Sequence, residues 1–364
     1  MVASLLLVGI IGIATVAFIN TNRFGKNPSG ERLSLIENSP NYANGVFKNL
    51  TETPVLTEGV SYGSVLIEFL FSSKPGEPKD SLPSVKTDLK SLDPDQNVMI
   101  WMGHSSYFLQ IDGKNILVDP VLSGHASPFS FTTRSYKGTD IYSTEEIPDI
   151  DYVFISHDHW DHMDVKTLKS LQPRIGKVIT GLGNGAHLES WGFNPDQILE
   201  GDWYDSIELD SGIVAHVTPT RHFSGRGFKR AKTLWASFVY SSHGKQYYFG
   251  GDSGYGTHFK EIGERYGPMD LAVLENGQYD EHWKYIHMLP GEQFTAASDL
   301  NAHTIFPVHS GKFTLANHSW DEPFCKITEL SKQHNQRVIT PKIGEVVDLS
   351  DRSQLFEEWW KSVN

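Results

Sequence analysis

The sequence predicts an α/β fold of the mixed (α+β) kind, in which two mixed β-sheets carry helices on their outer faces. From residue 97 onwards, apolar stretches typical of strands alternate with stretches typical of helices. Two pairs of these strands are joined by tight turns, so antiparallel hairpins occur among the other connections. With 364 residues, of which 39% are apolar and 21% charged, the chain is long enough for one large globular domain with extensions.

The predicted strands are runs of aliphatic, aromatic and β-branched residues bounded by glycine, proline or polar residues. They cover residues 97–103, 106–119 with a turn at Asp112-Gly113, 151–156, 177–180, 212–220, 234–252 with a turn at His243-Gly244, 269–275 and 303–310. Helices are predicted over residues 164–171 and 290–300.

The N-terminus has a different character. Residues 4–19 are apolar and uncharged, but the run is short for a full membrane span, which needs ~20 apolar residues. We expect residues 1–22 to be a hydrophobic anchor or signal segment that associates the protein with a membrane. The basic residues that follow favour a cytoplasmic main body, although the sequence leaves the side of the membrane and a cleavage of the segment open.

Composition divides the rest of the chain into three parts. Residues 23–96 are rich in Asn, Ser, Pro, Gly and Lys, and include the loop 72–84, so they are expected to be an extension and linker. Residues 97–348 contain the alternating strands and helices of the main domain, and residues 349–364 form a C-terminal tail.

Charge and cysteine content restrict the function. The net charge of -13 argues against nucleic acid as a partner, because the phosphate backbone attracts basic surfaces. Cys325 is the only cysteine, so the chain can form neither an internal disulfide nor a four-cysteine zinc site. A bound metal must therefore be held by histidine and carboxylate side chains.

Metal-binding residue types are concentrated in "SHDHWDH", residues 156–162, directly after a predicted buried strand. His157 and His159 are two positions apart, so both rings can face one ion. Asp161 and His162 follow at the turn into a helix and can face a second ion. The alternative is a polar loop of hydrogen-bonded histidines, which we disfavour because closely spaced buried imidazoles are costly without a strong electrostatic partner.

Three more polar residues follow other predicted strands in the same way. His222 ends "VTPTRH", Asp252 ends "YYFGGD" and His309 ends "IFPVH". Each alone would be an ordinary residue at the end of a strand. Together with the first cluster they complete a ligand set for two metal ions, which we expect to be two zinc ions. Manganese and iron also accept His and Asp ligands, so the sequence leaves the identity of the metal open.

The chain resembles the metallo-β-lactamase superfamily, and within it the N-acylphosphatidylethanolamine phospholipase D family. The resemblance covers residues 97–348. It is carried by "WMGHSS", "ILVDPVLS", "YVFISHDHWDHMD", "TPTRHFSGRG", "FGGDSGYGTHFKEIGERYGPMDLA", "YIHMLP" and "PVHSGKFTLANH". It implies a four-layered αβ/βα sandwich with a dinuclear site at the edge where the two sheets meet.

The resemblance also implies roles for individual residues. His157, His159 and His222 would bind one zinc, while Asp161, His162 and His309 would bind the other. Asp252 would bridge the two ions, and Asp119 would orient a ligand imidazole. His287 matches a family histidine near the reacting phosphate, and His104 would be structural or would support a ligand. We therefore expect Asp161, Asp252 and His287 to take part in catalysis.

This ligand set predicts a zinc-dependent phosphodiester hydrolase of phospholipase D type. Two zinc ions about 3.5–4 Å apart can share a water and lower its pKa from about 15.7 towards ~7, which yields a bridging hydroxide as nucleophile. The expected partner is a phospholipid such as N-acylphosphatidylethanolamine at a membrane surface. The oligomeric state is open, with a homodimer as one candidate.

Two alternatives remain. One is another hydrolase of the superfamily, a lactonase or phosphodiesterase that acts on a soluble small molecule. The other is a protein that binds a ligand or metal without turnover, which the complete ligand set disfavours. The stretches "HSGKF" and "GLGNGAHLESWG" depart from the phospholipase pattern, so head group and acyl preference stay undetermined.

Overall fold

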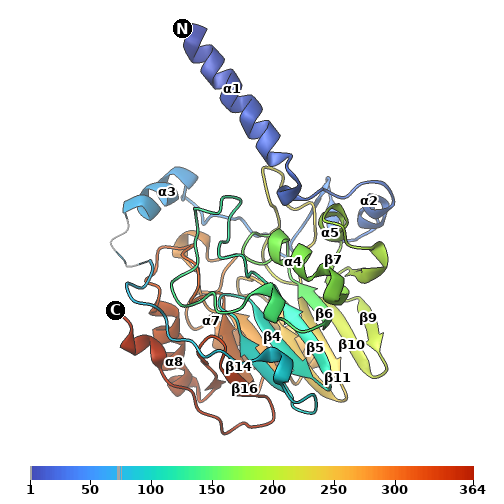
Figure 1. The fold of residues 1–364 in the computed structure, drawn as a ribbon, viewed down its shortest axis with the longest axis vertical. Helices are drawn as coiled ribbons and strands as arrows, with labels where there is room; N and C mark the ends of the chain where they lie inside the picture. The colour runs from blue at the N-terminus through green and yellow to red at the C-terminus, as the bar shows by residue number, and fades with distance from the viewer. Residues whose placement is uncertain (1, 72–73, 75) are drawn as a thin grey trace.

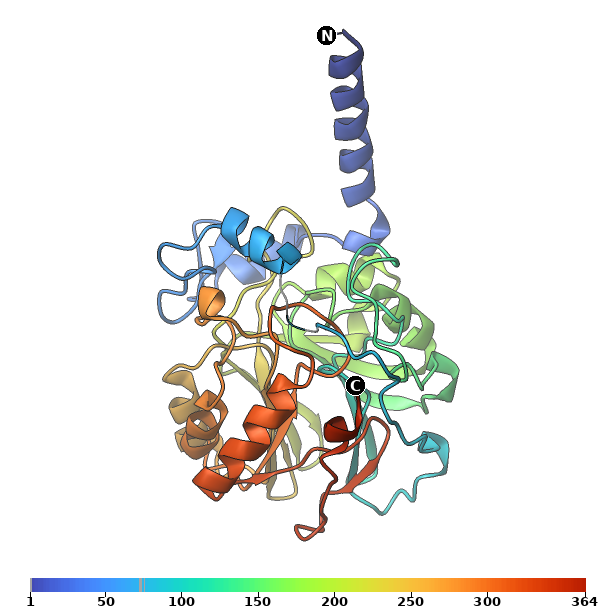
Figure 2. The same ribbon diagram turned by 90° about the vertical axis from the view of Figure 1, so that its left-hand side faces the viewer.

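Two seven-stranded sheets face each other, and helices cover the outer face of each (Figures 1 and 2). The computed structural model describes residues 2–71, 74 and 76–364. Ser72, Ser73 and Pro75 of the predicted loop 72–84 lie outside the described residues, as does Met1. The order helix, sheet, sheet, helix confirms the predicted four-layered αβ/βα sandwich.

The first sheet is built from the N-terminal half of the main domain and one late strand. Its centre is parallel, because β5, β6, β7 and β8 run in the same direction, whereas β16, β3 and β4 pair in antiparallel fashion. In spatial order its strands are β16 (Val346–Asp348), β3 (Val98–Trp101), β4 (Tyr107–Ile111), β5 (Lys114–Val118), β6 (Ile150–Ile155), β7 (Ile175–Gly181) and β8 (Ile198–Gly201).

The second sheet mirrors this arrangement with the following part of the chain. Strands β12 to β15 are parallel, and β9 to β12 form an antiparallel meander. In spatial order its strands are β15 (Arg337–Val338), β14 (Thr304–Val308), β13 (Leu271–Glu275), β12 (Lys245–Phe249), β11 (Ser237–Ser242), β10 (Ile213–Thr218) and β9 (Ser206–Asp210).

Both predicted hairpin turns are present. Asp112 and Gly113 connect β4 to β5 with φ angles of 49° and 72°. His243 and Gly244 connect β11 to β12 with φ angles of 44° and 86°. Two successive positive φ angles are characteristic of the tight turns whose twist matches that of the flanking strands.

A core of aromatic and aliphatic side chains joins the two sheets. Phe154 on β6 is fully buried, and its ring lies 5.2 Å from the rings of both Phe238 and Phe249 on the opposite sheet. Offset and edge-to-face aromatic pairs of this kind add to the stabilisation from buried area. The sheets are therefore held face to face across their middle, and this fixes where their ends lie.

Helices bury the outer faces of the sheets through two further cores. On the first sheet these are α4 (Val165–Leu171) and α5 (Gly185–Ser190), which contribute Leu168 and Leu188. On the second sheet, Phe259, Phe294 and Ile327 come from three helices. These helices are α6 (His258–Tyr266), α7 (Glu292–Asp299) and α8 (Glu322–His334).

The apolar N-terminal segment forms helix α1 (Val2–Ile19), which projects from the body in both views (Figures 1 and 2). Its 18 residues fall short of the ~20 that the hydrocarbon core requires. In the part of the chain that the structure describes, no helix is long and apolar enough to cross a membrane. The expected membrane association through this segment is therefore wrong.

Residues after α1 form short elements that lie against the main domain. Arg32 forms ion pairs with Glu189, at 2.5 Å, and with Glu200. Phe47 is buried in the core between the sheets, where it is 1% exposed. The extension comprises α2 (Gly30–Glu37), β1 (Tyr42–Ala43), β2 (Val46–Phe47) and α3 (Tyr62–Phe71).

We expect Phe154→Ala to lower the free energy of unfolding by about 3–5 kcal/mol, because truncation of a buried phenylalanine removes its transfer energy and leaves a cavity. Denaturant unfolding of the chelator-treated protein measures this change without a contribution from bound metal. Phe228→Ala is the matched control, since this side chain is 80% exposed and its loss should change stability by less than about 0.5 kcal/mol. Equal losses in the two variants would contradict the assignment of Phe154 to the central core.

Candidate metal centre

The predicted site residues follow neighbouring strands that end at the same edge of the two sheets. In the first sheet, β5 and β6 are parallel and are followed by Asp119 and by the loop that begins at Ser156. In the second sheet, β12, β13 and β14 are parallel, and they lead to Asp252, Glu275 and His309. Because the carboxyl ends of parallel strands meet at one edge, these residues converge there.

The loop between β6 and α4 holds the densest group of candidate ligands. The backbone N–H groups of His162 and Met163 both donate to the carbonyl oxygen of His159, which closes a tight turn. Asp164 then caps α4 by accepting a hydrogen bond from the N–H of Lys166 at 3.1 Å. This geometry sends His157 and His159 to one side of the loop and Asp161 and His162 to another.

One group of possible ligands consists of His157, His159, His222 and Asp252, whose donor atoms lie within 4.8 Å of one another. His157 Nε2 lies 2.9 Å from His159 Nδ1 and 3.9 Å from Asp252 Oδ2. His222 Nε2 lies 3.3 Å from His159 Nδ1. Three imidazole nitrogens therefore surround one point, as expected of a histidine-rich metal site.

A second group consists of His104, Asp161, His162 and His309, again with donor atoms within 4.8 Å of one another. Asp161 Oδ2 lies 2.9 Å from His104 Nε2, 3.3 Å from His309 Nε2 and 3.4 Å from His162 Nε2. His104 therefore contacts Asp161, and its supporting role stays a prediction.

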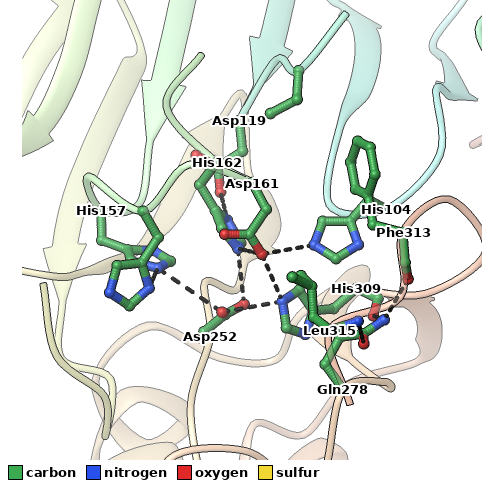
Figure 3. Close-up of polar contacts among 12 residues, drawn as sticks. His104, Asp119, His157, Asp161, His162, Asp252, Gln278, His309, Phe313 and Leu315 are labelled. Atoms are coloured by element: carbon green, nitrogen blue, oxygen red, sulfur yellow. Dashed lines mark hydrogen bonds and ion pairs between the residues drawn. The ribbon is translucent and has the colours of Figure 1, made fainter. Parts of the chain in front are cut away.

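Asp252 lies between the two groups (Figure 3). Its Oδ2 faces His157 at 3.9 Å and His309 at 3.1 Å, and its Oδ1 faces His162 at 3.2 Å. The side chain of Asp252 is only 3% exposed. A buried carboxylate with histidines on both sides has the position of a bridging ligand between two cations.

The donor set fits bound metal. Among the described residues, His162 Nε2 and Asp252 Oδ1 are buried and make no hydrogen bond. A buried polar atom without a partner costs about 1–3 kcal/mol. Imidazole nitrogen and carboxylate oxygen are ligands that zinc, manganese and iron accept. Metal coordination would satisfy both atoms, which otherwise have only ion-pair contacts, with each other at 3.2 Å and, for His162, with Asp161 at 3.4 Å.

The electrostatics of the site also favour cations. Burial on its own lowers the pKa of an imidazole, and it holds the pKa values of His157 and His222 well below the usual range. At His309 burial is outweighed by the Asp252 and Asp161 carboxylates, which raise the pKa to about 10. Asp252 and Asp161 likewise overcome burial at His162 and raise its pKa well above the usual range. The carboxylates thus draw positive charge into this edge of the fold.

Asp119, which follows β5, is hydrogen-bonded to the loop after β6. It accepts hydrogen bonds from the Ser156 N–H at 2.8 Å and from the Ser156 hydroxyl at 2.6 Å. His162 Nδ1 lies 2.8 Å from Asp119 Oδ2, and as the donor it leaves Nε2 as the metal-facing nitrogen. Asp119 therefore contacts the imidazole of His162, and its role in orienting a metal ligand stays a prediction.

His287 lies at the same edge, held by a residue that the sequence did not reveal. Its Nδ1 lies 2.8 Å from Oε2 of Glu275, and its ring stacks 5.1 Å from that of His309. Glu275 is 2% exposed, and it also accepts hydrogen bonds from the backbone N–H groups of Ser253, at 3.1 Å, and Met288. Burial raises the pKa of Glu275. The sequence offered only one signal for Glu275, its position as an acidic residue at the end of an apolar strand.

Gln278 is a second residue that sequence analysis missed. Its side-chain amide donates to the carbonyl oxygens of His309, at 3.3 Å, and Phe313, at 3.1 Å, and its Oε1 accepts from the N–H of Leu315 at 2.9 Å. Figure 3 shows the Gln278 side chain next to His309, with dashed lines to its hydrogen-bond partners. Gln278 thus fixes the loop that presents His309.

The structure brings all of the predicted site residues to one edge of the sandwich. None of them points to a different part of the molecule, and their roles as ligands or catalytic groups stay predictions. The residues are His157, His159, Asp161, His162, His222, Asp252, His287 and His309.

Known proteins are similar to this chain in sequence. Residues 114–310 match the family described as Beta-lactamase superfamily domain. An uncharacterized protein of Mycobacterium tuberculosis is 36% identical over 330 residues, which cover 89% of this chain and 88% of that protein. N-acyl-phosphatidylethanolamine-hydrolyzing phospholipase D 1 of Caenorhabditis elegans is 29% identical over 303 residues, which cover 75% of this chain and 85% of that enzyme.

A solved structure shows the same fold at lower sequence identity. Igni18, a metallo hydrolase from the archaeon Ignicoccus hospitalis, has a TM-score of 0.53 and is 21% identical, with 69% of this chain and 97% of that chain covered. The predicted resemblance and the predicted fold are thereby confirmed.

We expect metal binding to release at least about one proton per chain at pH 8, because imidazoles must be deprotonated to coordinate a metal. His309, with a pKa of about 10, carries a proton at this pH before metal binds, and the raised pKa of His162 acts in the same direction. Below these pKa values metal competes with protons, so apparent affinity should rise with pH. Calorimetric titration of the chelator-treated protein in buffers of different ionisation enthalpy measures the release. A binding enthalpy that is the same in all buffers would contradict this prediction.

Proposed function

This chain belongs to the β-lactamase superfamily, and we propose that within it the protein is a zinc-dependent phosphodiester hydrolase of phospholipase D type. The coarser assignment, a metal-dependent hydrolase with the metallo-β-lactamase fold, follows from the family match and the candidate ligand clusters. The proposed substrate is a phospholipid of the N-acylphosphatidylethanolamine class, presented at a membrane surface.

One observation carries the proposal. A protonatable histidine, His287, stands beside both ligand groups, so that Asp252, Glu275, His287 and His309 offer donor atoms within 4.8 Å of one another. The similarity to the nematode phospholipase, which covers 75% of this chain, supports the substrate class.

The metal ligands divide between two zinc ions in this proposal. His157, His159 and His222 would hold one ion, Asp161, His162 and His309 would hold the other, and Asp252 would contact both. When bound, two such ions lower the pKa of water and neutralise charge on phosphate oxygens. The ligand residues contribute a rigid frame, because Asp119 and the strand ends restrict their movement.

His287 moves the proton in this proposal. Its Nδ1 donates a hydrogen bond to Glu275, which leaves Nε2 free to face the substrate. In the neutral form Nε2 accepts a proton from the attacking water, and in the cationic form Nε2 returns a proton to the leaving alkoxide. The Glu275 carboxylate stabilises the cation while it exists. The centroid of the His287 ring lies 5.0 Å from that of His222, so His287 is adjacent to a proposed ligand.

Substrate class is tested with vesicles. Zinc-loaded protein should convert N-acylphosphatidylethanolamine in phosphatidylcholine vesicles to phosphatidic acid and N-acylethanolamine. Mass spectrometry measures the amounts of both products. A soluble aryl phosphodiester serves as the second substrate in the same buffer. Hydrolysis of the soluble diester without release of phosphatidic acid would overturn the lipid assignment, and hydrolysis of neither would overturn the phosphodiesterase proposal.

We expect His287→Ala to reduce kcat by about 10²–10⁴-fold, the range typical of a lost general acid–base group. Metal content should stay at the wild-type level, because His287 is not among the proposed ligands, and mass spectrometry of the metals checks this. His216→Ala is the matched control. His216 lies on β10, where its ring stacks on Tyr266, and it belongs to neither group of proposed ligands. Wild-type kcat in His287→Ala would remove His287 from the mechanism.

A further inference from the structure

The extension that precedes the main domain reaches the metal centre through one side chain. Asn49 follows the short strand β2 and is partly buried. Its Nδ2 donates a hydrogen bond to the backbone carbonyl of His222 at 2.7 Å. The backbone N–H of His222 in turn donates to Asn49 Oδ1 at 3.1 Å. One amide side chain therefore pairs with both backbone polar groups of a proposed metal ligand.

We infer that Asn49 is a positioning residue of the metal centre, which fixes the His222 backbone so that the imidazole reaches the ion shared with His157 and His159. This inference rests on the proposed metal-dependent function of the same site. It assigns a role to a segment that lies outside residues 114–310, the part of the chain that matches the family.

His222 needs such a restraint because it is not on a regular strand. Strand β10 ends at Thr218 and β11 begins at Ser237, so His222 lies in the long connection 219–236. Residues in long connections lack the ladder of hydrogen bonds that holds a strand. By contrast, His157 comes directly after Ser156, the first residue beyond β6. The carbonyl oxygen of Ser156 accepts a hydrogen bond from the backbone N–H of Ala236.

The ring of His222 is fixed by a separate contact. Its Nδ1 lies 3.0 Å from the carbonyl oxygen of Ile286, so Nδ1 carries the proton and Nε2 is left as the metal-facing atom. Asn49 thus determines the position of the backbone, while Ile286 determines the orientation and tautomer of the ring. Together the two contacts define where Nε2 lies.

Asn49 itself is held from two directions. The neighbouring Phe47 is 1% exposed in the core between the sheets, and its backbone N–H donates to the carbonyl of Ala231 at 2.8 Å. The indole N–H of Trp235 donates to Asn49 Oδ1 at 3.1 Å. Next to His222, the Arg221 guanidinium donates to Thr53 Oγ1 at 3.1 Å and to the carbonyl of Glu52 at 3.3 Å. The segment is therefore a fixed part of the site.

The test compares two variants of Asn49 with a control from the same segment. Asn49→Ala removes all of the side-chain hydrogen bonds. Asn49→Asp keeps the size and the acceptor but replaces the Nδ2–H donor with an oxygen that faces the His222 carbonyl. The control is Asn41→Ala, because the Asn41 amide donates to Asp202 at 2.8 Å and Asp202 is not among the proposed ligands. All three are made in the full chain.

The probe is Co²⁺, added to chelator-treated protein in competition with a metal-binding dye. Absorption of bound Co²⁺ reports the geometry of its ligands, which a merely structural residue would leave unchanged. We expect wild type and Asn41→Ala to bind two equivalents. Both Asn49 variants should bind one equivalent about 10–100-fold more weakly, with an altered spectrum for that equivalent, as is typical when a residue that orients a ligand is lost.

The outcomes separate the two proposals. Wild-type protein that binds no Co²⁺ would overturn the proposed metal-dependent function itself. Two equivalents of unchanged affinity and spectrum in both Asn49 variants would overturn the role of Asn49 and leave the proposed function standing. Thermal unfolding without metal provides the folding check. If Asn49→Ala proves less stable than Asn41→Ala, the isosteric Asn49→Asp variant decides the question.

Discussion

The buried carboxylate of Asp252 is the constraint on which the rest of the structure depends. An ionised group with 3% exposure carries a large desolvation penalty unless charges of the opposite sign surround it. Asp252 has imidazoles on two sides, and its carboxylate raises the pKa values of His162 and His309. The surrounding fold can be understood as the means by which ligands from distant parts of the chain are brought to this charge. Neither sheet alone could do so, because each provides only part of the set.

The topology explains why the two sheets meet at such a site. Parallel strands in the middle of each sheet point their carboxyl ends to a common edge, and the aromatic contacts between Phe154, Phe238 and Phe249 hold the sheets in register. The residue that follows each strand can then contact a residue from the opposite sheet. Connections that carry no proposed ligand are free to vary without loss of this convergence.

Local signals in the sequence were sufficient for the parts of the fold that local physics determines. Turns at Asp112-Gly113 and His243-Gly244 need positive φ, and the dipeptides themselves indicate it. The spacing of His157, His159, Asp161 and His162 could likewise be recognised from one short stretch. Glu275 could not, because a single acidic residue at the end of an apolar strand has no local mark that distinguishes it. Its contacts with Ser253 and His287 exist only once the strands have assembled. The N-terminal extension was harder still, since its composition resembles that of a linker although it packs on the main domain.

The proposed ligands differ in how their backbone is held, and this difference accounts for the supporting residues. Those in the loop after β6 gain rigidity from the strand and from Asp119. His222 and His309 instead depend on amide side chains that bond to their backbone, Asn49 for the first and Gln278 for the second. An amide suits this task because it offers a donor and an acceptor without adding charge to the site. The constraint set by the buried Asp252 carboxylate therefore extends to neutral side chains that are not among the proposed ligands but hold the backbone of those ligands.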